Sequence, residues 1–469
     1  MTAAIPMLPF IYIAVAAMVV ALLTGRSYLL LRPSVWFVVC MLVHLNFAAA
    51  FVESPFDGDL EDNGLFRLLA VLFPIGVLGW VVVTPKLSQT ARVILQMCHA
   101  TQPAPQGTSR YERRFKLLIA AISGVILVSY VLQVPVQSLG LTAVLTGSAG
   151  AAMAREESLK LLDNAFLRYG YLLHMGVFGP FLAGTVALWR SHTLASKSVQ
   201  AILLVLIVVS VSLTGARSPA GFLLLSLALL HLLRRGFCQG GVALMLAATV
   251  GLMIASAMSL LREGRLDELT VEKVAETTVG PITDRVFVMP FETGLFTVLY
   301  SQERGLLGVS SIRPLALLLG YEYEHLANKV ALEYYLGALE SGSANTCFLF
   351  DLQASFGLLG GWLIALVLLC VLDFALNLLR RVSPGIVPVF TTVLLVCAYG
   401  LISCAYTTSL ISHGLLPTVA LAWCFVRWAP AGTGGAVAAD ARTRSVFRGV
   451  GSRPRAATIP SRLTLEGPT

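Results

Sequence analysis

Arginines in the turns and loops between long apolar runs are the residues of this sequence best suited to chemistry. Arg217 is the clearest case, because it lies in the tight turn Gly215-Ala216-Arg217-Ser218-Pro219. A guanidinium is planar, permanently charged and able to hold a phosphate through two parallel hydrogen bonds. Gly215 and Pro219 would fix the turn and bring its backbone N–H groups close to the same anion. The turn therefore favours binding of a phosphate or diphosphate group.

Further arginines could converge on the same anion from other segments. The sequence offers Arg168, Arg262, Arg265, Arg285, Arg304 and Arg313. We take Arg168, Arg285 and Arg313 as the diphosphate-binding candidates beside Arg217. Other roles stay open: Arg217 could extend toward lipid headgroups, and Arg285 could pair with the adjacent Asp284. The loop arginines, taken singly, are also typical of a solvated surface.

His325, Glu292 and Asp284 are the candidates for a catalytic base. His325 follows the alternating Tyr and Glu residues 321–324, whose carboxylates could raise its pKa and orient its ring. The aromatic side chains of this run could stack on the faces of sugars. The run also fits a solvent-exposed helix turn, which is the alternative interpretation.

Sequence signatures of metal or nucleotide binding are missing. The chain has no HExxH pair, no P-loop and no glycine-rich dinucleotide fingerprint after a strand. The acidic pair Asp57 and Asp59 stands in a short acidic stretch that is typical of a solvated loop. The eight cysteines include no CxxC pair, so neither a disulfide framework nor a metal site is indicated. We expect no metal, no cofactor and no nucleic-acid partner.

The elements that must position these residues are apolar runs long enough to cross a membrane. Of the 469 residues, 57% are hydrophobic and 12% are charged, whereas a soluble domain has about 25% charged residues. The runs reach roughly 20 residues, the length of a membrane-spanning helix, and they lack the alternation of barrel strands. We predict an all-α polytopic membrane bundle of about eleven transmembrane helices with one large periplasmic loop. The predicted spans lie near 5–24, 33–52, 65–84, 116–134, 168–189, 199–214, 219–233, 240–261, 354–379, 385–406 and 411–427.

Lys and Arg residues set the predicted orientation. Every odd-numbered span exits into a basic segment, as with Arg26 and Arg32 after the first span, whereas the loop after the second span is acidic. Basic loops face the cytoplasm, so the N-terminus is predicted to be periplasmic and the C-terminus cytoplasmic. This orientation places Arg217 in a short periplasmic turn, where the rule disfavours arginine. A functional role such as phosphate binding would explain its position.

Composition divides the chain into a membrane domain and a tail. Residues 1–428 are the predicted membrane domain, and its periplasmic loop covers 262–345. Residues 429–469 are rich in small and polar residues and contain six arginines, so we predict a disordered, basic cytoplasmic tail. The first apolar run has no basic flank and no cleavage site, so we expect a retained helix.

Three segments of the chain resemble the bacterial oligosaccharide repeat-unit polymerases of the Wzy, or O-antigen polymerase, family. They are the turn at residues 213–218, similar to the family's Thr-Gly-x-Arg turn; the long loop with Asp284-Arg285 followed by Pro290; and residues 343–346 running into the glycine-rich 356–361. The layout of spans and loops extends the similarity over most of residues 1–427.

The resemblance implies an enzyme at the outer face of a bacterial inner membrane. Such polymerases transfer a growing glycan from undecaprenyl diphosphate to the non-reducing end of a new lipid-linked repeat unit, building O-antigen, capsule or exopolysaccharide. The family uses no nucleotide sugar and no known metal, and it works alongside a flippase and a chain-length regulator. Carried over by position, Arg217 and Arg285 would hold the diphosphates and stabilise the charge on the leaving group.

Two other functions stay open. An O-antigen ligase, which moves finished glycan to lipid A core, would share the many spans and the large outer loop. A lipid-linked sugar transporter or flippase is the alternative from another class, and such proteins tend to show internal repeats and midplane charges. Here no repeat relates the two halves, and Asp373 is the clearest charge within a span. The single large loop fits an outer active site better.

Overall fold

The computed structural model describes residues 7–53, 63–99, 109–146, 158–162, 164–189, 193–215, 217–236, 240–242, 245–246, 249, 287–335, 346–404 and 406–429. These residues form helices joined by short turns, with no β-strand among them, so the expected all-α class is confirmed for this part of the chain. The chain divides into two units, Met1–Trp428 and Ala429–Thr469. The predicted tail lies outside the described residues except for Ala429.

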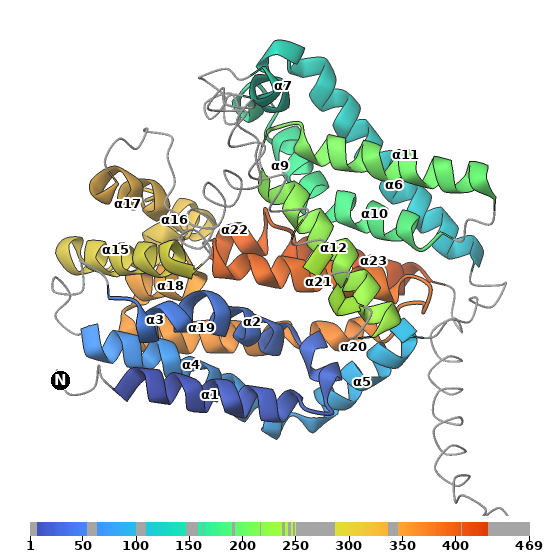
Figure 1. The fold of residues 1–469 in the computed structure, drawn as a ribbon. Helices are drawn as coiled ribbons and strands as arrows, with labels where there is room; N and C mark the ends of the chain where they lie inside the picture. The colour runs from blue at the N-terminus through green and yellow to red at the C-terminus, as the bar shows by residue number, and fades with distance from the viewer. Residues whose placement is uncertain are drawn as a thin grey trace, which may run out of the picture. The chain divides into compact units, whose positions relative to one another are not determined.

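Fourteen helices form most of the described fold (Figure 1). They are α1 (Leu8–Leu23), α2 (Pro33–Met41), α4 (Asn63–Val83), α5 (Pro85–His99), α6 (Ser109–Gln133), α9 (Ala165–Leu173), α10 (Gly179–Ala187), α11 (Leu194–Ser212), α12 (Arg217–Arg235), α15 (Met289–Arg304), α18 (Phe348–Phe356), α19 (Leu358–Leu372), α21 (Val387–Tyr399) and α23 (Leu415–Trp428). Further helices are α3 (Phe47–Phe51), α7 (Gly140–Leu145), α16 (Arg313–Leu319), α17 (Leu326–Tyr334), α20 (Ala375–Leu379) and α22 (Tyr406–Leu410).

Seven helical stretches are long and apolar enough to cross a membrane. They are Pro33–Phe51, Asn63–Val83, Arg110–Gln133, Ala165–Ala187, Leu194–Ser212, Leu358–Leu379 and Thr408–Trp428. Leu8–Leu23 and Val387–Ile402 are apolar but shorter. The predicted span 219–233 is part of α12, and most of 240–261 lies outside the described residues. The chain is therefore a polytopic membrane protein by helix length and composition, and the predicted number of eleven remains a prediction.

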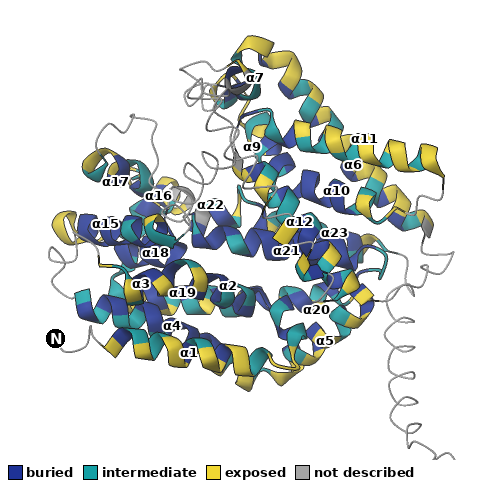
Figure 2. Ribbon diagram, viewed as in Figure 1, coloured by how far each residue is buried: buried dark blue, intermediate teal, exposed yellow. Residues whose placement is uncertain are grey.

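Burial separates a central helix from peripheral ones. Every residue of α21 from Val387 to Ala398 is buried, which Figure 2 shows in dark blue. In α11 only 11% of the most apolar window is buried, and side chains such as Val205 and Leu206 are exposed. Exposed apolar side chains on a long helix match a hydrocarbon surrounding better than water. These burial patterns agree with a bundle set in a membrane.

Two of the candidate spans contain a π-helical turn. In one span it covers η3 (Leu42–Asn46), and in another it covers η6 (His174–Phe178). The ring of His174 is buried and lies 2.8 Å from the Ser123 hydroxyl and 2.9 Å from the Ser210 hydroxyl. Single π turns within helices often mark functional positions. Here both turns adjoin the candidate site described below.

One end of the bundle, which we call the Arg32 end, is closed by a buried ion pair. Arg32 and Asp373 are both fully buried, and a guanidinium nitrogen lies 2.6 Å from the Asp373 carboxylate. The same carboxylate accepts hydrogen bonds from the Ser34 backbone at 3.0 Å, the Ser34 hydroxyl at 2.7 Å and the Trp80 indole at 3.1 Å. Burial of two charges is tolerated when each is paired and hydrogen-bonded. This cluster joins the start of α2 to the ends of α4 and α19.

Candidate functional site

The turn before Arg217 is braced by a second segment of the chain. Gly215 has a positive φ of 70°, a conformation that glycine adopts without steric cost. A Cβ added to Gly215 would lie 2.6 Å from the Gly140 carbonyl oxygen, and a Cβ on Gly140 would collide with the Thr214 carbonyl. The Leu141 N–H donates to the Leu213 carbonyl at 3.0 Å. The two glycines therefore allow α7 to touch the turn backbone to backbone.

Arg217 is the first residue of α12, so this brace fixes where its backbone begins. Its side chain lies outside the described part of the structure. The Thr214 hydroxyl contacts the Met175 sulfur at 3.8 Å, which ties the turn to the π-helical turn of η6. The turn is thus held on two sides, by α7 and by η6.

Two of the other segments that carry the family resemblance meet directly. Thr346 is buried, and its hydroxyl donates to the Pro290 carbonyl at 3.1 Å. The contact joins the first turn of α15 to the residues that lead into α18. Residues 336–345, including the Ser343 end of this segment, lie outside the described residues.

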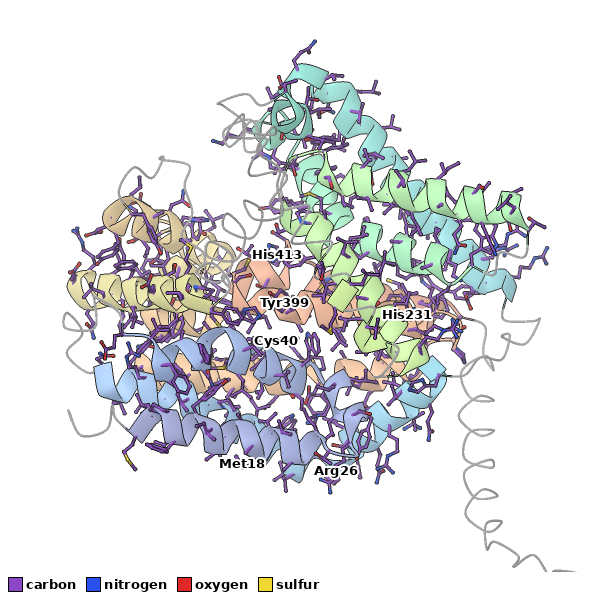
Figure 3. The ribbon with its side chains drawn as sticks, viewed as in Figure 1. Met18, Arg26, Cys40, His231, Tyr399 and His413 are labelled. Atoms are coloured by element: carbon purple, nitrogen blue, oxygen red, sulfur yellow. The ribbon has the colours of Figure 1, made fainter. Side chains whose placement is uncertain are left out.

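An aromatic and histidine-rich layer links the Arg217 turn to these segments. A Cβ on Gly176 would lie 3.2 Å from the His413 carbonyl oxygen, so η6 packs against the α22–α23 connection. The His413 ring lies edge-on to Phe222 with centroids 6.2 Å apart, and Phe222 lies edge-on to Tyr399 at 6.1 Å. The His44 ring then lies 5.5 Å from Tyr399. Figure 3 shows His413 and Tyr399 together in the interior of the bundle.

We call this part of the bundle the Arg217 end, because it gathers the helix ends opposite to those at the Arg32 end. It contains the starts of α4, α12 and α19 together with α15, α18 and α22. The label describes the bundle alone and assigns no side of a membrane.

Asp351 is a buried carboxylate at the Arg217 end. It lies in α18, before the candidate span that begins at Leu358, and it is 6% exposed. Within the described segments, its carboxylate accepts one hydrogen bond, from the Tyr406 backbone N–H at 3.4 Å. No Lys or Arg of the described segments forms an ion pair with it. Burial raises the pKa of the Asp351 carboxyl to about 7, and the Tyr406 hydrogen bond offsets part of this effect.

Several hydroxyl groups lie near Asp351, and the Ser355 hydroxyl donates to the Asp351 backbone carbonyl at 2.8 Å. Burial raises the pKa of the Tyr406 hydroxyl, Asp351 raises it further, and Ser311 lowers it. The Ser311 and Ser355 hydroxyls lie 2.7 Å apart, and both are buried. A carboxyl group with a pKa near neutrality can exchange protons at physiological pH. The cluster therefore has the capacity for acid–base chemistry.

The predicted catalytic bases have different surroundings. His325 is exposed and is the N-cap residue of α17, where its Nδ1 accepts a hydrogen bond from the Asn328 N–H at 3.2 Å. Glu292 is partly buried in the first turn of α15, where an acidic side chain is favoured by the helix dipole. Asp284 lies outside the described residues. The described contacts do not join His325 or Glu292 to Asp351.

The predicted diphosphate-binding arginines are only partly described. Arg285 lies outside the described residues, and Arg313 begins α16 with a side chain that is not described. Arg168 donates from Nε to the Leu159 carbonyl at 3.1 Å and from Nη2 to the Leu162 carbonyl at 3.1 Å. These bonds satisfy carbonyls at the end of a short helical turn, as a structural cap does. Binding of diphosphate by these three arginines remains a prediction.

A buried arginine that sequence analysis did not select also lies at the Arg217 end. Arg67 is 4% exposed, and its guanidinium donates to the Ala49 carbonyl at 2.7 Å and to the Val52 carbonyl at 3.0 Å. It lies 5.1 Å from the centre of the Phe291 ring, a cation–π distance. These contacts join α3, α4 and α15. Its position near the start of an apolar run was the only available signal.

The described residues contain no group of three or more His, Cys, Asp or Glu side chains that could hold a metal ion. Comparison with known proteins found no matching family model, no matching curated protein and no matching solved structure.

Proposed function

We propose that this protein polymerises undecaprenyl-diphosphate-linked oligosaccharide repeat units into a surface polysaccharide at the periplasmic face of a bacterial inner membrane. The product would be O-antigen, capsule or exopolysaccharide. The observation that carries the proposal is that the described parts of the three resemblance segments lie at one end of the bundle. Thr346 bonds to Pro290, and the Gly215 turn connects to them through η6, His413 and α22.

The proposed reaction needs no group beyond the two substrates and the chain's own side chains. The acceptor hydroxyl oxygen forms a bond to the anomeric carbon of the donor, and the bond from that carbon to the lipid diphosphate breaks. The lipid diphosphate leaves with the bonding electron pair, and the hydroxyl proton passes to a base. Because a diphosphate is already a good leaving group, positioning and charge stabilisation are the main tasks.

In this proposal, Arg217 and Arg285 stabilise the negative charge on the leaving diphosphate. Asp351 is the side chain best suited to accept the proton, because it is buried, lacks a cationic partner among the described residues and has a pKa of about 7. His325, Glu292 and Asp284 remain the bases predicted from the sequence. The hydroxyls of Tyr406 and Ser311 would then orient the acceptor or the carboxyl group.

Substitution of Arg217 tests the proposal. In a strain that lacks its own copy, Arg217→Ala should insert normally, as measured by immunoblot of membranes, while long-chain polysaccharide disappears from a glycan gel. Arg217→Lys should also be poor, because lysine cannot make the bidentate contact. Arg304→Ala is the matched control, since Arg304 forms an exposed ion pair with Glu333 at 2.9 Å. Normal chain lengths in Arg217→Ala would remove Arg217 from the mechanism.

The deletion strain itself separates the polymerase from the ligase. Loss of a polymerase leaves lipopolysaccharide capped with one repeat unit, whereas loss of a ligase leaves bare core. A transporter defect would instead prevent repeat units from reaching the outer face. Bare core in the deletion strain would overturn the polymerase assignment.

The proposed orientation is open to direct measurement. Ser218 and Arg26 are both exposed and lie at the Arg217 and Arg32 ends. We expect Ser218→Cys to react with a membrane-impermeant maleimide added outside the inner membrane, and Arg26→Cys to react only after permeabilisation. The reverse pattern would place the Arg217 end in the cytoplasm and would contradict polymerisation at the periplasmic face.

A further inference from the structure

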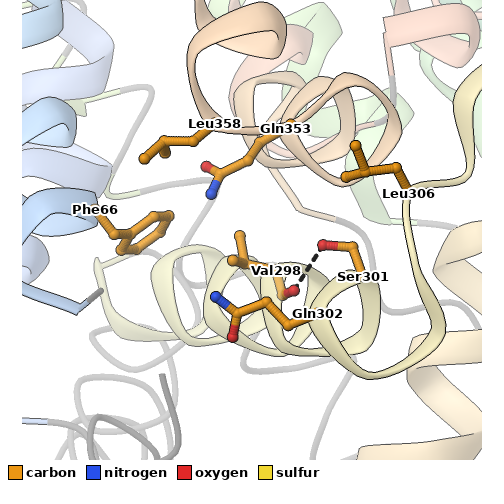
Figure 4. Close-up of a pocket in the computed structure, with 8 residues that line it drawn as sticks. Phe66, Val298, Ser301, Gln302, Leu306, Gln353 and Leu358 are labelled. Carbon is orange, nitrogen blue, oxygen red and sulfur yellow. Dashed lines mark hydrogen bonds between the residues drawn. The ribbon is translucent and has the colours of Figure 1, made fainter. Parts of the chain in front are cut away.

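A cavity of about 280 Å³ lies at the Arg217 end, at the corner between α18 and α19 (Figure 4). Its lining includes Phe66, Ser301, Gln302, Leu306, Gln353 and Leu358. The volume is close to the roughly 300 Å³ at which ligand pockets begin. None of its lining residues in the described segments carries a charge.

The corner that forms the cavity depends on two glycines. Gly357 has a positive φ of 79°, so the chain turns sharply between the two helices. A Cβ on Gly361 would lie 2.5 Å from the Gln353 backbone nitrogen. The start of α19 therefore packs directly on the backbone of α18, and the Gln353 side chain is held beside it.

The orientation of the Gln353 amide follows from its neighbour. The Trp362 indole N–H donates to the Gln353 Oε1 atom at 2.9 Å. An indole nitrogen can only donate, so the amide oxygen must face Trp362 and the amide NH₂ must face away. Gln353 is 5% exposed, and Figure 4 shows its nitrogen directed into the space between Phe66 and Val298. The Gln353 amide therefore presents a fixed hydrogen-bond donor to the cavity.

Other polar groups face the same space. The Ser301 hydroxyl donates to the Val298 carbonyl at 2.7 Å, which leaves its oxygen lone pairs able to accept. The exposed amide of Gln302 lies on the same helix and supplies both a donor and acceptors. Phe66 and Leu306 add apolar surface. Paired donors and acceptors beside an apolar wall match the hydroxyls and the C–H face of a sugar ring.

We propose that this cavity is a binding site for one neutral sugar ring. An anionic group such as diphosphate is disfavoured, because no charged side chain of the described lining would compensate its desolvation. The site stands at Leu358, where a candidate membrane span begins. Leu359 and Leu363 follow as exposed apolar residues on α19. A sugar on a lipid carrier could therefore enter the cavity while the lipid chain stays in the hydrocarbon. The lipid carrier as the source of the sugar rests on the proposed function, but the affinity of the cavity for a sugar ring does not.

The test uses the full chain purified in detergent and four neutral methyl glycosides, those of glucose, galactose, rhamnose and N-acetylglucosamine. Saturation-transfer NMR should detect binding of at least one glycoside. Leu306→Trp, a change at an exposed position on the cavity mouth, should raise the apparent Kd at least tenfold. Leu359→Trp is the matched control, because it places the same side chain on the exposed face of α19 outside the lining; its Kd should stay within twofold.

Gln302→Ala gives a second, milder measurement, with an expected rise in apparent Kd of about threefold to tenfold. The assignment is overturned if none of the four glycosides binds, or if Leu306→Trp binds as tightly as the unchanged protein. Arg217→Ala separates this result from the proposed function. The Arg217→Ala protein should still bind the glycosides although its strain makes no long-chain polysaccharide. If this variant makes normal polysaccharide and still binds the glycosides, the polymerase mechanism is refuted but the sugar-binding cavity is not.

Discussion

Asp373 at the Arg32 end and Asp351 at the Arg217 end are both buried carboxylates, but their partners differ. Asp373 is paired with Arg32 and accepts three further hydrogen bonds from Ser34 and Trp80. Among the residues that the structure describes, Asp351 accepts one hydrogen bond, of 3.4 Å, from the Tyr406 backbone N–H. A fully partnered charge holds helices together, whereas an under-partnered carboxyl costs stability and stays available to a substrate. The comparison separates an end whose buried carboxylate is paired with a guanidinium from an end whose buried carboxylate is not paired within the described residues.

The largest expected effect comes from breaking the pair at the Arg32 end. Asp373→Ala leaves the Arg32 charge buried without its partner, which typically costs about 3–5 kcal/mol. We expect a large fall in the thermal unfolding midpoint of the detergent-solubilised protein. The double variant Arg32→Met with Asp373→Leu should recover most of the loss, because it removes both charges. An unchanged midpoint in Asp373→Ala would show that the pair does not close this end.

Asp351→Asn should separate activity from stability at the other end. We expect polymer formation to fall about 10²–10⁴-fold, the usual contribution of a positioned base, while the unfolding midpoint at pH 8 stays the same or rises. Polymer yield in membrane vesicles and thermal unfolding measure the two quantities. A variant that unfolds readily but keeps full polymer formation would reverse the roles assigned to the two ends.

The same carboxyl predicts how stability depends on pH. Its pKa in the folded protein is about 7, above the ordinary value of 3.8, so the folded state binds a proton more tightly than the unfolded state. Its charge therefore destabilises the fold most above about pH 7, and this penalty disappears as the pH falls toward 4. The Asn variant should lack this gain on acidification. Parallel stability curves for the two proteins would contradict the raised pKa.

A smaller effect is expected where two resemblance segments meet. Thr346→Val keeps the shape of the side chain but removes its hydrogen bond to the Pro290 carbonyl. The expected loss is about 0.5–1.5 kcal/mol, seen as a modest fall in the unfolding midpoint. Polymer length should shift more than for an equally destabilised variant elsewhere, because the bond connects α15 to α18. If Thr346→Val and an equally destabilised variant elsewhere change polymer length by the same amount, the contact has only a structural role.

The smallest effect is expected from the partly exposed Lys116, whose ammonium lies 2.6 Å from the buried Glu112 carboxylate one helical turn away on α6. Lys116→Ala should cost about 0.3–0.5 kcal/mol, and less at high salt. Thermal unfolding at low and high salt measures it. A loss comparable to that of Asp373→Ala would mean that burial does not decide the strength of these pairs.

Local composition predicted the helices but left much of the site undecided. Apolar runs predicted the positions of the spans because a run of hydrophobic residues is a local property of the sequence. Arg217 was predicted from the glycine- and proline-containing turn around it. Gly140 carried no such signal: its role depends on contact with Gly215. Asp351 was detectable only as an acidic residue in an apolar stretch. Its partner Tyr406 is 55 residues away, a distance over which no periodic pattern extends.

The sequence by itself determined that the chain is helical and apolar enough for a membrane, because every backbone group in hydrocarbon must be paired within its own helix. Tertiary structure decided which polar residues are buried and how they are satisfied. Asp373 and Asp351 are the same residue type in neighbouring stretches, yet one meets a guanidinium and the other a backbone N–H. That difference arises from packing between distant helices, since the local dielectric and the available partners set the behaviour of a buried carboxyl group.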